Sequence, residues 1–189
     1  DEEWEKAEEF LFKALEVEPA NAEVMVQIGY HVHAKKEQWL EMNKIFNSAL
    51  EANPEAKINS RPISEVIKNY RNMFWAENYN KSVRTYNDYK NSKDKKILQK
   101  AIDRFEQTVN IDPNEGQTYS ILSTSYYELG NNDKAIEIGK KAVELMPNEF
   151  QPNMALGQIL SFSGDKEGSL KYIEKASEIE PSNSSAITM

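Results

Sequence analysis

The regular spacing of prolines constrains this chain more than any other feature. Pro113, Pro147 and Pro181 end three similar phrases, RFEQTVNIDP, IGKKAVELMP and YIEKASEIEP, and recur at one constant interval. Two earlier prolines, Pro19 and Pro54, end FLFKALEVEP and IFNSALEANP and are separated by nearly the same interval. A fixed period of about 34 residues indicates a repeat architecture in which each repeat is one supersecondary unit.

The phrases share a pattern of residue types, but they are not recent copies of one another. Residues 126–149 and 160–183 align at an offset of one period, and only five of the 24 aligned pairs are identical. A small residue stands five positions before each proline: Ala14, Ala49, Thr108, Ala142 and Ala176. Because a small side chain lets another helix approach closely, the pattern predicts an antiparallel partner helix just upstream of each phrase.

Each phrase also has the periodicity of an amphipathic helix. In the fourth, Ala135, Ile138, Ala142 and Leu145 recur at a spacing of three to four residues, with Lys and Glu on the opposite face. The proline then ends the helix. The upstream partner helices are expected at residues 24–34, 118–129 and 153–162.

The short segments GNND (130–133) and GDKE (164–167) separate the two helices of a pair. Gly130 and Gly164 are predicted to adopt the left-handed conformation that ends a helix, and the Asn or Asp that follows is predicted to cap the next one.

On these features the chain resembles the tetratricopeptide repeat family. The resemblance implies an all-α fold, a right-handed superhelical solenoid of antiparallel helix pairs. Positions of the family's repeat pattern correspond here to Met25, Ile28, Gly29, Val32, Met42, Phe46, Ala49 and Pro54, to Tyr119, Leu122, Ser123, Tyr126, Ala135, Gly139, Ala142 and Pro147, and to Asn153, Leu156, Gly157, Leu160, Ser169, Ile173, Ala176 and Pro181. Asn153 and Gly139 depart from that pattern.

A single array is predicted to occupy residues 1–189. We expect the second helix of a truncated repeat at 1–20, repeats at 21–55, 115–148 and 149–182, an enlarged repeat at 56–114, and the start of a further repeat or a tail at 183–189. Because both ends interrupt a repeat, we expect the sequence to be a fragment of a longer protein.

The enlarged repeat reflects the interval between Pro54 and Pro113, which is more than one and a half times as long as the others. Helical spacing predicts one long helix at about 63–89 and a second at about 94–110. An additional short helix with a break near residues 69–72 is the alternative. The long helix is expected to project beyond its neighbours, with Tyr86 or Tyr89 packed on Ile97 or Leu98 and basic residues outside.

The resemblance implies that the first helices of the repeats line a concave groove that contacts partners. The mixed apolar, amide and hydroxyl side chains at these positions suit an extended peptide. Carried onto this sequence, the candidate groove contacts are Val26, Tyr30, His33, Asn80, Arg84, Gln117, Ser120, Thr124, Tyr127, Gln151, Met154 and Gln158.

Two more specific functions are not supported by the sequence. Chaperone-binding members of the family grip a carboxylate with Lys, Arg and Asn, but the corresponding positions here are Val26, Tyr30, Gln117, Ile121, Gln151 and Ala155. Catalysis, a cofactor and a metal site are not expected, because His31 and His33 diverge on a helix and no phosphate-binding glycine loop or nucleophile motif is present.

Charge is distributed unevenly along the chain. Residues 1–55 carry a net charge of −8, residues 56–113 of +5 and residues 114–189 of −5. The basic, aromatic segment 71–96 gives an alternative function, a nucleic-acid-binding helical repeat. We expect a non-catalytic scaffold for protein interactions. Its partner and oligomeric state stay open, as does its location, in the bacterial cytoplasm or envelope.

The composition limits the alternatives further. The chain has no cysteine, and therefore no disulfide or thiolate metal site. It also has no uninterrupted apolar run long enough to cross a bilayer, so no membrane span is expected.

Overall fold

The structure is a computed structural model that describes residues 2–182, and it divides into two compact units. Within the described residues, unit 1 contains 2–77 and 110–112, and unit 2 contains 78–109 and 113–182. The predicted tail at 183–189 lies outside the described residues. Where each repeat of the array begins and ends stays a prediction.

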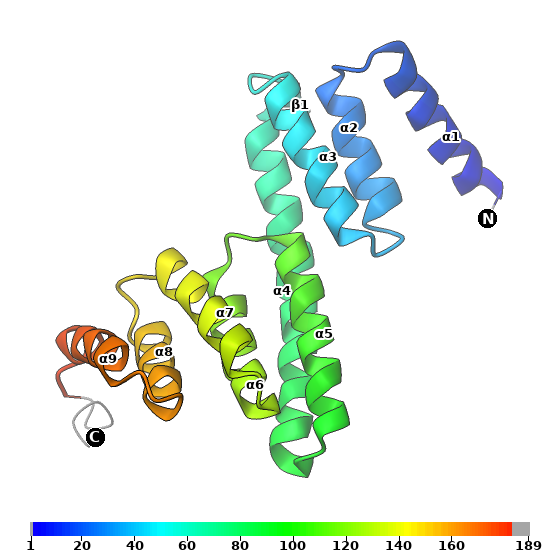
Figure 1. The fold of residues 1–189 in the computed structure, drawn as a ribbon. Coiled ribbons are helices and arrows are strands. Elements are labelled where there is room, and N and C mark those ends of the chain that lie inside the picture. The colour runs from blue at the N-terminus through cyan, green and yellow to red at the C-terminus, as the bar shows by residue number, and fades with distance from the viewer. Residues whose placement is uncertain (1, 183–189) are drawn as a thin grey trace. The chain divides into compact units, whose positions relative to one another are not determined.

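Unit 1 consists of helices and one very small hairpin (Figure 1). Its elements are α1 (Glu2–Val17), α2 (Ala22–Ile28), the π-helical turn η1 (Gly29–His33), α3 (Trp39–Ala52), β1 (Lys57–Ile58), β2 (Arg61–Pro62) and the first half of α4 (Ile63–Ser92).

A glycine allows α3 to approach the end of α2 closely. A Cβ atom added to Gly29 would lie 2.3 Å from the Phe46 ring, so any larger residue would displace that ring. Phe46 is fully buried, as are Met42 and Ile63 of the same apolar cluster. This cluster holds α2, α3 and the first half of α4 together.

The hairpin before α4 was not expected from the sequence. Lys57 pairs with Pro62 and Ile58 pairs with Arg61 in antiparallel register. The two residues between the strands, Asn59 and Ser60, have φ angles of 50° and 67°. Two consecutive positive φ angles are typical of a tight type I′ turn, which matches the twist of the strands that it joins.

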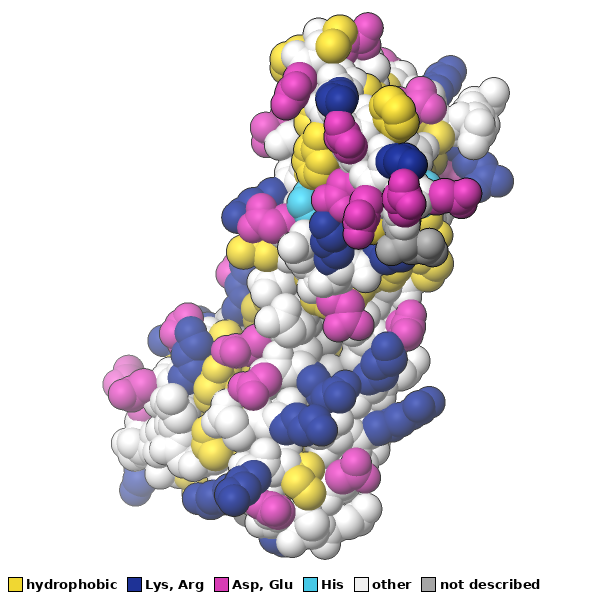
Figure 2. Space-filling view, turned by 90° about the vertical axis from the view of Figure 1, so that its right-hand side faces the viewer, with side chains coloured by type: hydrophobic (Ala, Val, Ile, Leu, Met, Phe, Trp, Pro, Cys, Tyr) yellow, Lys and Arg dark blue, Asp and Glu magenta, His cyan; other side chains and the backbone are white. Residues whose placement is uncertain are grey.

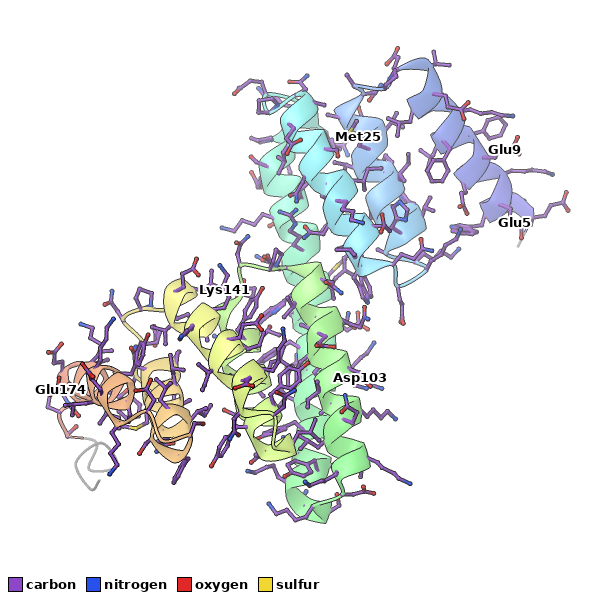
Figure 3. All side chains as sticks on the ribbon, viewed as in Figure 1. Glu5, Glu9, Met25, Asp103, Lys141 and Glu174 are labelled. Carbon is purple, nitrogen blue, oxygen red and sulfur yellow. The ribbon has the colours of Figure 1, made fainter. Side chains whose placement is uncertain are left out.

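Unit 2 is built from helices that pair in sequence order (Figure 1). After the second half of α4 it contains α5 (Lys95–Ile111, up to residue 109), α6 (Gly116–Leu129), α7 (Asn132–Leu145), α8 (Phe150–Phe162) and α9 (Lys166–Ile179). The pairs α6 with α7 and α8 with α9 are antiparallel. Charged side chains such as Asp103 and Glu174 lie on the outer faces of the helices (Figure 3). The predicted all-α class of helix pairs is confirmed.

The predicted helix caps are also confirmed. Gly130 and Gly164 have φ angles of 98° and 91°, in the left-handed region that glycine adopts without strain. The Asn131 side chain accepts a hydrogen bond from the Lys134 N–H at 3.2 Å, and Asp165 accepts one from the Gly168 N–H at 2.8 Å. Each short connection therefore ends one helix and starts the next.

The small residues predicted to face partner helices are buried with one exception. Ala49, Thr108, Ala142 and Ala176 are at most 1% exposed. Ala14, at the equivalent place on α1, is exposed. Thr108 also reaches across to Ser82 of α4, with 3.2 Å between the two hydroxyl oxygens. The periodic small residue therefore marks the surface where two helices meet.

The long helix forms as one uninterrupted element of 30 residues, Ile63–Ser92. The alternative with a break near residues 69–72 is therefore wrong. Tyr89 and Leu98 lie in one buried cluster, which confirms that the ends of α4 and α5 pack on each other.

Side chains near the far end of α4 also contact α6. The Tyr86 hydroxyl donates a hydrogen bond to Glu128 Oε2 of α6 at 3.0 Å. The Lys90 ammonium group lies 2.7 Å from Glu128 Oε1. The far end of α4 therefore belongs to the packed helices of unit 2.

Candidate functional site

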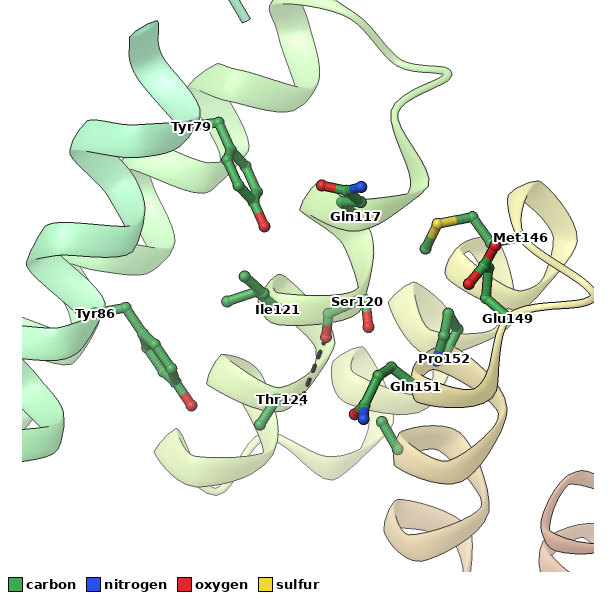
Figure 4. Close-up of a pocket in the computed structure, with 11 residues that line it drawn as sticks. Tyr79, Tyr86, Gln117, Ser120, Ile121, Thr124, Met146, Glu149, Gln151 and Pro152 are labelled. Carbon is green, nitrogen blue, oxygen red and sulfur yellow. Dashed lines mark hydrogen bonds between the residues drawn. The ribbon is translucent and has the colours of Figure 1, made fainter. Parts of the chain in front are cut away.

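A pocket of about 480 Å³ lies in unit 2 between α4, α6 and α8 (Figure 4). These are the first helices of successive pairs, the helices that were predicted to line a groove. The pocket is lined by Tyr79 and Tyr86 of α4, Gln117, Ser120, Ile121 and Thr124 of α6, Met146 and Glu149 between α7 and α8, and Gln151, Pro152 and Ala155 of α8.

Helix geometry explains why the lining residues of α6 share one side. Gln117, Ser120, Ile121 and Thr124 are spaced by three and four residues, which places them on one face of a helix. The Thr124 hydroxyl donates to the Ser120 carbonyl oxygen at 3.2 Å (Figure 4). This face of α6 presents three polar side chains and the apolar side chain of Ile121 to the pocket.

Phe105 supports the two tyrosines of α4. This residue of α5 is fully buried, and its ring lies edge-on to Tyr79 at 6.2 Å and to Tyr86 at 6.5 Å between centroids. Edge-to-face packing restricts both rings, so the tyrosines form a fixed wall of the pocket.

Both tyrosine hydroxyls stay protonated near neutral pH. Burial raises the pKa of Tyr79. Burial, followed by the negative charge and hydrogen bond of Glu128, raises the pKa of Tyr86 well above its usual range. The wall therefore presents neutral phenols and no phenolate.

The lining combines hydrogen-bonding groups with apolar surface and carries little charge. Glu149 is its only charged residue, and no Lys or Arg lines it. The amides of Gln117 and Gln151 are exposed and make no hydrogen bond with other described residues. Amides of this kind can pair with the N–H and C=O groups of an extended peptide, while Ile121 and Pro152 offer apolar contact.

Four of the twelve predicted groove contacts line this pocket: Gln117, Ser120, Thr124 and Gln151. Three other predicted residues of the same helices do not. Tyr127 stacks on Phe162 of α8, with ring centroids 5.9 Å apart, Gln158 is half-buried outside the lining, and Met154 is 5% exposed in the core.

The remaining five predicted contacts lie elsewhere. On α4, Asn80 and Arg84 are exposed but do not line the pocket. In unit 1, Val26 is buried in the core and Tyr30 stacks on Tyr70, with ring centroids 4.2 Å apart. The ring of His33 contacts the amide oxygen of Gln38 at 2.9 Å and lies edge-on to Phe12.

The sequence interpretation did not include the tyrosine wall. Tyr79 and Tyr86 are seven residues apart, which is two helical turns, and this spacing was the available signal. The sequence prediction placed the groove face of α4 on Asn80 and Arg84. Asn80 lies one position beyond Tyr79. Met146 and Glu149 were also missed, because they belong to a connection and not to a first helix.

The described residues give no sign of a metal site or of a membrane-crossing helix. Among them, no group of three or more His, Asp or Glu side chains could hold a metal ion. No helix in residues 2–182 combines the length and the apolar character needed to cross a bilayer.

Comparison with known sequences identifies repeats in the C-terminal part of the chain. Residues 116–149 and 151–183 each match the tetratricopeptide repeat family model. Residues 116–183 therefore contain two tetratricopeptide repeats. The two matches overlap the repeats predicted at 115–148 and 149–182, whose bounds stay a prediction.

Curated relatives match this chain over less than half of its length. The CTR9 homolog of Arabidopsis thaliana is 32% identical over 79 residues, 42% of this chain and 7% of that protein. Small glutamine-rich tetratricopeptide repeat-containing protein 2 of Mycosarcoma maydis is 26% identical over 83 residues, 44% of this chain and 24% of that protein. The matched segment is thus a small part of each relative.

Solved structures share the fold. A double mutant of MamA from Desulfovibrio magneticus RS-1 has a TM-score of 0.51 and 21% identity, over 96% of this chain and 88% of that chain. The first tetratricopeptide repeat domain of RPAP3, bound to the HSP90 peptide SRMEEVD, has a TM-score of 0.51 and 21% identity, over 56% of this chain and 81% of that chain. At these identities the likeness concerns the fold alone.

Proposed function

We propose that this protein is a non-catalytic interaction module that binds an extended peptide in the pocket between α4, α6 and α8. One observation carries the proposal: the amides of Gln117 and Gln151, which make no hydrogen bond with other described residues, line the pocket together with Ile121 and Pro152, on helices that are adjacent in space. Such a surface pairs with a peptide backbone and still leaves room for its side chains. The RPAP3 complex supports peptide binding as a use of this fold.

The charge of the pocket argues for a different peptide from SRMEEVD. That peptide is acidic, and here its carboxylates would meet Glu149 and no cation within the lining. A partly buried carboxylate without a cationic partner regains only part of its lost hydration from neutral donors, and Glu149 would repel it. We therefore expect a peptide that is neutral or basic where it enters the pocket.

The nucleic-acid alternative has less support. Base stacking needs exposed aromatic rings, but Tyr89 is buried and Tyr79 and Tyr86 pack against the cluster that contains Phe105. Phe74 and Trp75 pack against the core of unit 1. The aromatic residues of segment 71–96 therefore pack in the cores of the two units or line the pocket.

A peptide selection with a pocket-filling variant tests the proposed function. The immobilised chain would be screened against a phage library of random dodecapeptides, and the enriched peptide synthesised with a fluorescent label. Ala155→Trp places a large ring in the pocket and is expected to weaken binding at least 10-fold in an anisotropy titration.

Lys171→Trp, on an exposed position of α9, is the matched control and should leave the affinity within about 2-fold. Equal affinities for the wild type and Ala155→Trp would contradict binding in this pocket. Failure to enrich any peptide would contradict peptide binding itself.

A further inference from the structure

A row of basic side chains on α5 lies outside the pocket. Lys96, Lys100 and Arg104 recur every four residues and share one face of the helix, which we call the basic ridge. Lys93 and Lys95 flank its start. Figure 2, which looks at the side of Figure 1 on which α5 lies, shows Lys and Arg side chains gathered there.

The basic ridge lacks the ion pairs that other helices of unit 2 have. Lys134, Lys141 and Lys175 each contact a Glu three residues further along the helix, at 2.8 to 3.4 Å. Among the described residues, none of the three cations of the ridge has a carboxylate within ion-pairing distance.

The two carboxylates of α5 are engaged elsewhere. Asp103 accepts a hydrogen bond from the Gln99 amide at 2.8 Å, and Glu106 accepts one from the Tyr126 hydroxyl. The positive charge of the basic ridge is therefore not neutralised within the helix, although the whole chain carries a net charge of −8. A cationic surface on an anionic protein attracts partners of opposite charge.

The surroundings of the basic ridge favour an acidic polypeptide over other anionic partners. The only aromatic residue of α5 is Phe105, which is fully buried, so no ring is available to stack on a base. No large hydrophobic side chain of α5 is exposed among the described residues, so nothing there would insert into a bilayer.

We propose that the basic ridge is a second docking surface, and that its occupant is an acidic, extended segment of a partner protein. Four residues of helix advance about 6 Å, and alternate residues of an extended chain are spaced by about 6.8 Å. Carboxylates at every second position of the partner segment therefore come into register with Lys96, Lys100 and Arg104. This surface is separate from the pocket and takes a peptide of the opposite character.

A charge-reversal experiment tests this docking surface. The probe is a fluorescein-labelled decapeptide of glutamate, titrated by anisotropy at low salt, about 50 mM NaCl, where charge attraction is least screened. The triple variant Lys96→Glu, Lys100→Glu, Arg104→Glu is expected to bind the probe at least 10-fold more weakly than the wild type. The neutral triple variant to Gln should give an intermediate loss with an unchanged melting temperature.

The matched control reverses three other exposed lysines of unit 2, Lys140, Lys166 and Lys171, and changes the net charge by the same amount. It should retain the wild-type affinity within about 3-fold. Equal losses in both triple variants, or no binding of the probe by the wild type, would overturn the proposal.

Two further probes separate the other classes of partner. A fluorescein-labelled oligothymidylate of similar length, and vesicles of phosphatidylcholine and phosphatidylserine in equal parts, would be titrated under the same conditions. Weaker binding of both than of the glutamate peptide is expected. Tighter, ridge-dependent binding of either probe would overturn the assignment to an acidic polypeptide.

Discussion

Tyr86 connects the core of unit 2 to the wall of the pocket. Its ring packs on Phe105, while its hydroxyl donates to Glu128 of α6. The side chain thus fixes one helix against another and presents a neutral edge to the pocket. Tyr86 lies seven residues, or two helical turns, beyond Tyr79, so both tyrosines face the pocket from the same side of α4.

The raised pKa of Tyr86 predicts how stability changes at high pH. An unfolded tyrosine loses its proton near pH 10, whereas folded Tyr86 keeps its proton at higher pH. The native state then binds more protons than the unfolded state, so the free energy of unfolding falls as pH rises above about 10. This contribution is fully present below pH 10.

Urea denaturation of the wild type and Tyr86→Phe at pH 8 and pH 11 measures this effect. The variant should lose less stability between the two pH values than the wild type does, because it lacks the phenol that must ionise on unfolding. An identical loss in both proteins would show that Tyr86 titrates alike in the folded and unfolded states.

At the scale of elements, each repeated sequence phrase specifies one pair of packed helices. Ala142 of α7 is 1% exposed and follows the pattern shared with Ala49, Thr108 and Ala176. Gly139, one turn earlier, lies so close to α6 that an added Cβ would be 2.8 Å from the Ser123 hydroxyl. Small residues at these two positions set the short distance between α6 and α7.

Ala142→Leu should overfill this interface. Extra methylene groups in a packed core cost about 1–3 kcal/mol of stability, and urea denaturation of the variant measures the loss. Lys140→Leu, at an exposed position of the same helix, is the control and should change stability by less than about 0.5 kcal/mol. An unchanged midpoint for Ala142→Leu would contradict the close helix packing.

For helix α4, the sequence predicted the length of the element but only some of the partners of its side chains. Its bounds followed from periodicity, but its packing did not, because the apolar face shifts around the helix. Phe74 packs on the cluster of unit 1 and Tyr79 on that of unit 2, five residues later. Five residues turn a helix by about 140° beyond one full turn. The prediction assumed that one face of α4 lines the groove along the whole helix. It therefore placed the groove contact on Asn80 instead of Tyr79.

The extra length of the enlarged repeat has a related explanation. One repeat period counted back from Pro113 reaches Tyr79, so we interpret the second half of α4 as the first helix of a repeat whose second helix is α5. The additional residues supply the β1–β2 hairpin and the first half of α4. A two-residue turn of Asn59 and Ser60 carries too little sequence signal to have been recognised.

At the scale of the whole molecule, repeats that contact only their neighbours should fold without the complete array. A chain truncated after residue 148 lacks α8 and α9 but keeps α6 and α7 as a pair. We expect circular dichroism to show retained helix and a lower melting temperature. Complete loss of helical signal would mean that the helix pairs are not independent repeat units.

The most direct test of peptide binding in the pocket is a map of amide chemical shifts. A ¹⁵N-labelled chain would be titrated with the peptide selected against the wild type, and perturbations would be followed residue by residue. We predict that the largest shifts cluster at Gln117, Ser120, Thr124 and Gln151, with little change on α1. Saturable binding whose largest shifts lie away from α4, α6 and α8 would contradict it.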